Sequence, residues 1–223
     1  MNARSKEIAN LFLNRAGQYS APELFTDWVK LASLSFAKCG LYMQPPKVIA
    51  EREELYNAIV QKHSKEEMET FYRATAALIE AMDEEMNDYL GEIYMWIGQA
   101  SSLAGQFFTP FHLSELTADV AIALGKDPEF IPTTFNEPAC GSGGLIIAAA
   151  KRMKKLGINY QKKMDVVCQD LDSRCVAMCH VQLSLYGISA IVVQGSTLTD
   201  PYDPVRTDPA NIYITPMKAG VFV

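Results

Sequence analysis

The pattern of hydrophobic residues changes near Gly105. Upstream of it, apolar side chains recur at intervals of three and four residues over long stretches, which is the pattern of amphipathic helices. Downstream, short apolar runs end at glycine or acidic residues and alternate with helix-length stretches, which is typical of parallel strands joined by helices. We therefore expect a helical N-terminal region over residues 1–100 and an α/β domain over residues 101–223.

The first part predicts a series of helices. Ser20 and Glu23 are spaced as the two ends of a capping box, and Pro22 suits the first turn of the helix that we expect to run to about Lys38. A later helix carries Thr75 as the one polar residue on its apolar stripe. The expected helices span residues 3–15, 20–38, 48–62, 65–84 and 86–98, and the stripe of the 65–84 helix comprises Met68, Phe71, Tyr72, Leu78, Ile79 and Met82.

The second part predicts strands that alternate with helices. Asp172 is expected to cap the helix after the second strand, and Gly187 is expected to stop it. The alternation indicates a sheet of about four strands with helices packed on it. The expected strands are residues 133–135, 165–169, 190–194 and 211–214, and the expected helices are 114–124, a helix from the glycines near 144 to about 156, and 173–186.

The composition is that of a folded protein. The 223 residues are 49% hydrophobic and 21% charged. No apolar run approaches the ~20 residues that span a bilayer, and the N-terminus lacks the apolar core and cleavage site of a signal peptide. Since the five cysteines are odd in number and lie mostly in apolar segments, a reducing cytosol suits them better than a disulfide framework. We expect a cytoplasmic protein without membrane contact.

The charge is unevenly distributed. The net charge is −6, but residues 51–92 contain twelve acidic and four basic residues, a net charge of −8, which leaves +2 for the rest of the chain. A basic cluster in the second part offers phosphate contacts, although a solvated helix end is the plainer interpretation. The cluster comprises Lys151, Arg152, Lys154, Lys155, Lys162 and Lys163.

The stretch from Phe135 to Ile147 carries the strongest functional signal. It reads FNEPACGSGGLII, which combines a short strand, a break at Glu137-Pro138, three glycines and the start of a helix. A strand, a glycine-rich turn and a helix in this order bind nucleotide-like ligands at the helix N-terminus. The glycines permit positive φ angles and let a ligand approach where a Cβ atom would block it. We therefore expect a nucleotide-binding turn.

This turn resembles the motif (acidic)-P-A-C-G-S-G-G of the amino-group DNA methyltransferases, and most closely that of the N-6 adenine-specific methylases of type I restriction–modification systems. The resemblance implies an α/β fold, with a partial Rossmann-like methyltransferase sheet behind a helical N-terminal region. It also implies S-adenosyl-L-methionine (AdoMet) as the cofactor and DNA as a partner. The turn residues that it assigns to the cofactor are Glu137, Pro138, Ala139, Cys140, Gly141, Ser142 and Gly143.

A second motif lies upstream of the turn. Residues 105–110 read GQFFTP and resemble the G-x-[FY]-[FY]-T-P motif, which in these methylases closes over the methionine end of AdoMet. The chemistry is suitable because a hydroxyl and free backbone N–H groups bind a carboxylate, and aromatic rings shield a sulfonium. The residues assigned to the cofactor are Phe107, Phe108, Thr109 and Pro110.

The ends of the second and third strands complete the expected cofactor site. The resemblance places Asp170 at the ribose hydroxyls, with Leu171 beside it. The family's G-D-x-L turn after the third strand reads Gly195-Ser196-Thr197-Leu198 here. Ser196 therefore stands where the family has an aspartate for the adenine amine, and it offers a weaker neutral hydrogen bond. Ser196 and Leu198 are assigned to the cofactor.

The chain departs from the family at the target base. Amino-methylases carry [NDS]-P-P-[YFW] after the fourth strand, with acceptors for the target amine and an aromatic ring that stacks on the flipped base. Here the expected strand is followed by Thr215 and Pro216, a degenerate version without the aromatic, and Tyr213 is the nearest ring. We assign Thr215 and Pro216 as the catalytic candidates, and expect a partner protein or a homodimer to complete the site.

The sequence leaves more than one interpretation of the protein's function open. The helical leader, with F-T-D-W, R-E-E-L-Y and D-Y-L-G-E-I-Y-M, resembles that of a compact group of adenine-methylase-like proteins in phages and mobile elements, which favours a natural short form that is truncated relative to a complete methyltransferase domain. A non-catalytic AdoMet-binding or interaction protein, and a methyltransferase for an amine of protein or RNA, are the alternatives.

Cys168, Cys175, Cys179 and His180 show no metal-ligand spacing, so we expect no metal site there.

Overall fold

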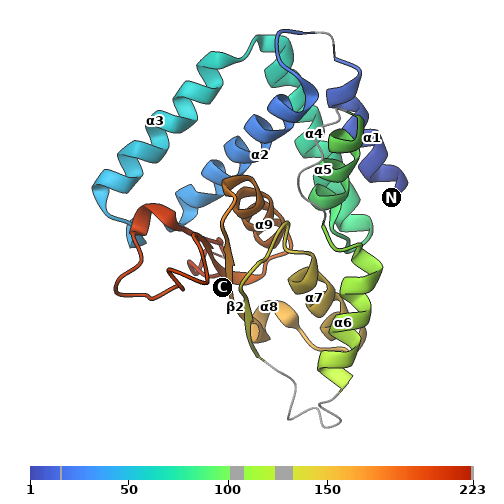
Figure 1. The fold of residues 1–223 in the computed structure, drawn as a ribbon, viewed down its shortest axis with the longest axis vertical. Helices are drawn as coiled ribbons and strands as arrows, with labels where there is room; N and C mark the ends of the chain where they lie inside the picture. The colour runs from blue at the N-terminus through green and yellow to red at the C-terminus, as the bar shows by residue number, and fades with distance from the viewer. Residues whose placement is uncertain (16, 101–107, 124–132, 222–223) are drawn as a thin grey trace.

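The computed structural model describes residues 1–15, 17–100, 108–123 and 133–221. Its first part is helical, as the periodicity predicts, and each expected helix is present with ends shifted by a few residues. Figure 1 shows these helices along the upper and right-hand sides of the molecule. Their bounds are α1 Ala3–Leu13, α2 Ala21–Ala37, the 3-10 helix η1 Lys38–Met43, α3 Pro46–Lys62, α4 Lys65–Glu84 and α5 Tyr89–Ala100. The next helix, α6 Phe111–Ala123, belongs to the second part of the chain.

Local signals set the helix ends. The capping box predicted at the start of α2 is present, because Glu23 Oε2 accepts a hydrogen bond from the backbone N–H of Ser20 at 2.9 Å. A second box, which Ser64 and Glu67 form, begins α4. Thr75, the polar residue on the stripe of α4, is satisfied because its hydroxyl oxygen accepts from Trp28 Nε1 at 2.9 Å.

The stripe of α4 is narrower than the sequence predicts. Tyr72 and Ile79 were expected to be buried but are exposed, at 63% and 48%. The buried face runs instead through residues one position away, which include the small side chains of alanines. Close helix packing uses small residues as readily as large ones, and a count of large apolar residues overlooks them. The buried residues of α4 include Phe71, Ala74, Leu78, Ala81 and Met82.

The second part contains a sheet of four strands in the order β1-β2-β3-β4. The first three are parallel, and β4 runs antiparallel along the outer side of β3. The strands are β1 Thr134–Glu137, β2 Asp165–Asp170, β3 Ser189–Gln194 and β4 Ile212–Ile214; the helices between them are α7 Gly144–Lys155, α8 Tyr160–Lys163, α9 Ser173–Leu185 and the 3-10 helix η3 Pro209–Asn211.

The two faces of the sheet differ. Right-handed crossovers from β1 to β2 and from β2 to β3 place α7 and α9 on the same face. On that face Val166, Cys168 and Val192 are fully buried. The opposite face carries Asn136 and Val167, and among the described residues the segment 197–202 lines a cavity of about 420 Å³ on it.

The position of β4 corrects one expectation. The resemblance assigns the residues that follow the fourth strand to the target base, but Thr215 lies at the end of the sheet opposite the glycine turn, where its N–H donates to Ala190 O at 3.1 Å. The physical reason is the connection over residues 195–211, whose regular structure is limited to the short η3. A parallel strand needs a crossover, usually helical, and without that helix the chain folds back beside the free edge of β3.

The helical and α/β parts share one hydrophobic core. Buried residues from α1, α2, α4 and α5 are continuous with those of α7, α9 and the sheet, and α2 packs along α9 (Figure 1). His180 on α9 joins three elements, because Nδ1 lies 2.9 Å from Ser33 Oγ on α2 and Nε2 lies 3.2 Å from Ile214 O on β4. Within the described ranges, no helix is both long and apolar enough to cross a membrane.

Candidate cofactor site

The glycine turn connects β1 to α7 at the carboxyl end of the parallel strands, which is where doubly wound sheets bind their ligands. Gly141 has a φ of 53° and Gly143 a φ of 94°, so both adopt the left-handed conformation that other L-residues avoid. The turn is fixed to the next strand because Cys140 N donates to Gln169 O at 3.0 Å. The strand, turn and helix predicted from the sequence are therefore present.

Close contacts also exclude side chains at these two glycines. A Cβ atom on Gly141 would lie 2.9 Å from the ring of Phe108, and one on Gly143 would lie 3.2 Å from Cys179 Sγ. The first contact is with the GQFFTP segment and the second with α9. The turn is therefore held between two elements that are distant in sequence.

Asp170 lies at the end of β2, directly against this turn. Its Oδ2 accepts from Gly141 N at 2.8 Å, and its Oδ1 accepts from Asp172 N at 3.0 Å. A carboxylate offers about four acceptor positions, so acceptor capacity remains for ribose hydroxyls. Asp172 is the predicted N-cap of α9, since its side chain accepts from Arg174 N. Leu171 between them is 72% exposed.

Part of the GQFFTP segment forms the other wall of the site. Gly105, Gln106 and Phe107 lie outside the described residues. Phe108 packs edge-on against Tyr94, with ring centroids 5.3 Å apart. Together with Thr109 it faces the turn across a cavity of about 120 Å³, lined also by Ala139, Cys140, Gly141 and Ser142. Pro110 follows at the start of α6 and lines an adjoining cavity of about 430 Å³.

The turn after β3 lies beside the glycine turn. Thr197 Oγ1 donates to Pro138 O at 2.6 Å, which fixes the two turns to each other. Ser196 Oγ accepts from Thr199 N at 3.3 Å. Leu198 is 96% exposed. Leu171 and Leu198 thus follow the carboxyl ends of adjacent strands and offer exposed apolar surface there.

Glu137, the acidic residue of the motif, is half-buried at the end of β1. Its Oε1 accepts from Ala139 N at 3.2 Å. Burial raises the pKa of this carboxyl, and the carboxylate of Asp170 raises it further. The two acids on adjacent strands therefore share one electrostatic environment at the edge of the site.

A buried network that sequence reasoning missed supports the turn from below. Asp88, just before α5, accepts from Ser142 Oγ at 2.6 Å, from Gln182 Nε2 at 2.8 Å and from Gly91 N at 3.0 Å. Gln182 also donates to the carbonyl oxygen of Ser142 at 2.8 Å. Burial raises the pKa of Asp88. In the sequence, only the D-Y-L-G motif indicated this network. It shows an acidic residue before a helix but does not indicate which side chain that residue contacts.

The predicted catalytic residues do not join this site. Thr215 is fully buried, and its hydroxyl donates to Ile188 O at 2.7 Å at the start of β3. Pro216 follows it there and is buried as well. Tyr213 packs against Arg52, whose guanidinium lies 4.4 Å from the ring centroid, so its ring is already engaged. The structure therefore does not bring Thr215 and Pro216 together with the glycine turn, because Thr215 is bonded to the start of β3.

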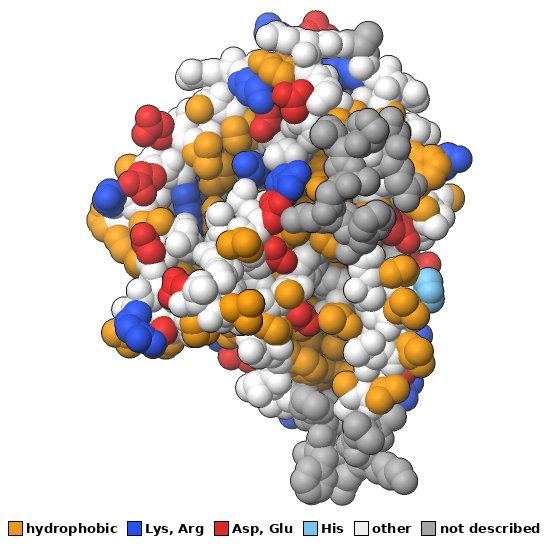
Figure 2. Space-filling model, viewed as in Figure 1, with side chains coloured by type: hydrophobic (Ala, Val, Ile, Leu, Met, Phe, Trp, Pro, Cys, Tyr) orange, Lys and Arg blue, Asp and Glu red, His pale blue; other side chains and the backbone are white. Residues whose placement is uncertain are grey.

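The basic cluster of α7 is largely paired with acidic residues. Lys151 Nζ lies 3.1 Å from both Glu85 and Glu115, and Arg152 Nε lies 3.2 Å from Asp119. On the face shown in Figure 2, basic and acidic side chains are interspersed with hydrophobic ones. These pairs favour the interpretation of the cluster as a solvated helix surface.

The fold and the turn define a nucleotide-binding α/β protein of the AdoMet-dependent methyltransferase class. Residues 85–215 match the family model described as N-6 DNA Methylase. Since the match covers more than half of the chain, the protein belongs to this family, whose cofactor is AdoMet. The matched region includes Asp88, the glycine turn and Asp170.

The chain is also similar to individual proteins, and it spans only part of the length of each. The chain is 27% identical over 110 residues to the methylase subunit of the type I restriction enzyme MjaIX from Methanocaldococcus jannaschii, which is 47% of this chain and 18% of that subunit. A type I restriction-modification methyltransferase subunit from Streptococcus thermophilus superposes with a TM-score of 0.46 and 14% identity, over 91% of this chain and 59% of that one. A putative class I AdoMet-dependent methyltransferase from Listeria monocytogenes gives 0.42 and 15%, over 82% and 57%.

Proposed function

We propose that this chain binds AdoMet at the glycine turn and acts as the cofactor-binding part of a DNA adenine N6-methyltransferase of the restriction–modification type. The observation that carries the proposal is the conformation of the turn. Gly141 and Gly143 both have positive φ, and the carboxylate of Asp170 lies against the first of them. This is the geometry in which a backbone receives a nucleoside and a strand-end acid receives its ribose.

The residues present fit the cofactor in two parts. The cavity of about 120 Å³ between Thr109 and Ser142 suits the amino-acid end, because it offers a hydroxyl and backbone N–H groups. The nucleoside suits the open edge beyond it, with the ribose at Asp170 and the adenine between Leu171 and Leu198. AdoMet supplies the methyl group from its sulfonium. The protein's part is to orient the two reactants and to exclude water.

The acceptor side of the reaction is assigned to DNA together with a second protein. A relative that matches over 110 residues is a methylase subunit. Thr215 lies at the far end of the sheet. We therefore propose that a partner chain supplies the acceptors and the aromatic ring for the target base. The same observation favours a second candidate, a protein that binds AdoMet without methylating, and leaves a different amine as an alternative acceptor.

A calorimetric titration of the purified chain with AdoMet tests the proposal. We expect one site per chain and a thermal stabilisation that grows with ligand concentration by mass action. S-adenosylhomocysteine should compete, because it keeps the nucleoside and the amino-acid end, whereas NAD should not. A folded protein that shows neither heat nor stabilisation at millimolar AdoMet would refute the proposed function.

A further inference from the structure

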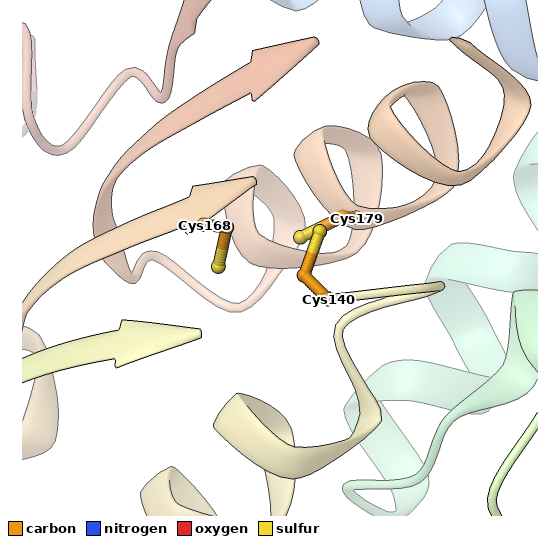
Figure 3. Close-up of side chains that lie close together, drawn as sticks. All are labelled: Cys140, Cys168 and Cys179. Carbon is orange, nitrogen blue, oxygen red and sulfur yellow. The ribbon is translucent and has the colours of Figure 1, made fainter. Parts of the chain in front are cut away.

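Three cysteines that are far apart in the sequence converge behind the glycine turn. Cys140 lies in the turn, Cys168 on β2 and Cys179 on α9, and Figure 3 shows their side chains meeting between these elements. The three sulfur atoms all lie within 4.8 Å of one another. Cys140 is 6% exposed, and the other two are completely buried. The sequence shows no metal-ligand spacing among these cysteines, because the three that meet come from different elements of the fold.

We propose that Cys140, Cys168 and Cys179 form a three-thiolate site for a thiophilic metal ion. Metal–sulfur bonds of about 2.3 Å around a trigonal or tetrahedral ion require sulfur atoms roughly 4 Å apart. The observed separations therefore need an inward movement of less than about 1 Å, which small rotations of three side chains supply. The group consists of sulfur alone, and all-sulfur ligands select soft or borderline ions such as Cu(I) and Zn²⁺ over Mg²⁺ or Ca²⁺.

The two ions suit different aspects of the site. Cu(I) accepts three thiolates without a fourth ligand. Zn²⁺ leaves a smaller net charge on three buried thiolates, and buried net charge is costly, but it requires a fourth ligand. Water can fill that position, since Cys140 also lines the cavity of about 120 Å³ on the cofactor side. The shared chemistry is a d¹⁰ ion bound by thiolates, and each thiol gives its proton to solvent when it binds.

A bound ion would link the glycine turn, β2 and α9 to one another. Cys140 precedes Gly141 in the turn, and Cys168 lies two residues before Asp170 on β2. Cys179 Sγ is the atom that a Cβ on Gly143 would meet. The ion would stabilise the turn from behind and leave the ligand-facing side open. Metal binding does not depend on the proposed function, so it can be tested without AdoMet.

The chain provides a matched control for the test. Cys175 is also buried and lies on α9 one turn before Cys179, but it is not part of the group. Reduced, metal-free wild-type protein, Cys168→Ala and Cys175→Ala would each be titrated with Cu(I) and, separately, with Zn²⁺ in the presence of a competing chelator. We expect one ion per chain in the wild type and in Cys175→Ala, with at least about tenfold weaker binding in Cys168→Ala. Equal affinities in all three proteins, or no binding by the wild type, would overturn the proposal.

A second measurement uses wild-type protein alone and so avoids variants that fail to fold. Under mild denaturation, all five cysteines should react with an alkylating agent when metal is absent. With one equivalent of the ion that binds, mass spectrometry should find Cys140, Cys168 and Cys179 protected while Cys39 and Cys175 react. Protection that is spread evenly over the five, or confined to Cys39 and Cys175, would show that the ion binds elsewhere.

Discussion

At the scale of single residues, Asp170 and Asp172 show how two residues of the same type have different roles. Asp170 accepts from Gly141 N and faces the ligand edge, whereas Asp172 caps α9 and pairs with Arg174 at 2.5 Å. The first contact belongs to the proposed site and the second to the stability of a helix.

We expect Asp170→Ala to weaken AdoMet binding by about 1.5–3 kcal/mol, because a charged acceptor for the ribose and for the turn is lost. Asp172→Ala should instead lower the free energy of unfolding by about 1 kcal/mol, with little change in affinity. Calorimetry and chemical denaturation of both variants separate the effects. A larger loss of affinity in Asp172→Ala would mean that the strand end has been misassigned.

His180 connects pH to stability. Burial lowers its pKa from 6.5 to about 4. Between these values the unfolded chain binds the proton and the folded chain does not, so stability falls as the pH drops through this window. The loss is at most about 3 kcal/mol for a shift of this size.

We expect His180→Gln to flatten this part of the stability curve, measured by urea denaturation between pH 7.5 and pH 4.5. The control is His112→Gln, because His112 is exposed. The comparison of slopes isolates His180 from carboxyl groups that titrate in the same range. Identical slopes in the wild type and in His180→Gln would contradict the assignment.

At the scale of elements, the glycine turn is the part of the chain where backbone conformation and ligand approach coincide. Gly157, which ends α7, offers a comparison. It also has a positive φ, of 76°, but a Cβ there would meet nothing within 4 Å. A Cβ atom at position 141 would in addition lie 2.9 Å from the ring of Phe108.

Gly141→Ala and Gly157→Ala should both cost about 1–2 kcal/mol of stability, since both place alanine in the left-handed region. Only Gly141→Ala should also weaken AdoMet binding, because the ring of Phe108 must move from the wall of the cavity. Thermal shifts with and without AdoMet measure both quantities. Equal loss of affinity in the two variants would show that the turn is sensitive to strain alone.

A buried hydrogen bond connects the segment before α5 to the glycine turn. Ser142 Oγ donates to buried Asp88, and an exposed pair of the same chemistry exists between Ser189 Oγ and Asp165, at 3.2 Å. We expect Ser142→Ala to lower the free energy of unfolding by about 1–3 kcal/mol, because a buried carboxyl group loses a hydrogen-bond donor. Ser189→Ala should change it by less than about 0.5 kcal/mol. Denaturant titrations of the two variants measure these changes in the free energy of unfolding. Equal changes in Ser142→Ala and Ser189→Ala would show that burial is not the cause.

At the scale of the whole molecule, the residues proposed for the cofactor and the residues expected at the target base lie at opposite ends of the sheet. The cofactor edge is built from β1, β2, β3 and the segment before α6, and α5 supports it. The acceptor residues expected from the sequence lie at the other end of the sheet, with Thr215 bonded to Ile188 and Tyr213 against Arg52.

We therefore expect the purified chain to bind AdoMet but to transfer a labelled methyl group to unmethylated duplex DNA at least about 10²-fold more slowly than a complete methyltransferase of this family, because preorganised acceptors of this kind contribute about that factor. AdoMet binding measured on the same sample is the control. Robust methylation by the chain alone would contradict this prediction.

Much of the local structure could be predicted because its causes are local. Capping residues, glycines and apolar periodicity act over a few positions, and they correctly located the helices, three parallel strands and the N-cap of α9. The resemblance of the turn identified the family before any contact was known. The resemblance assigned Asp170 to the ribose, and its position beside the turn follows because strand ends meet at one edge of a parallel sheet.

Other features depended on contacts between distant segments, which leave no periodic trace in a single sequence. The sequence alone determined that the chain forms helices, then a strand–turn–helix unit for a nucleotide, and that the chain belongs with the adenine methylases. Only the tertiary structure decided that β4 pairs antiparallel with β3, that Asp88 binds Ser142, and that three cysteines meet. Those outcomes depend on which free edge a strand finds and on which buried groups need partners, and both are settled by packing of the whole chain.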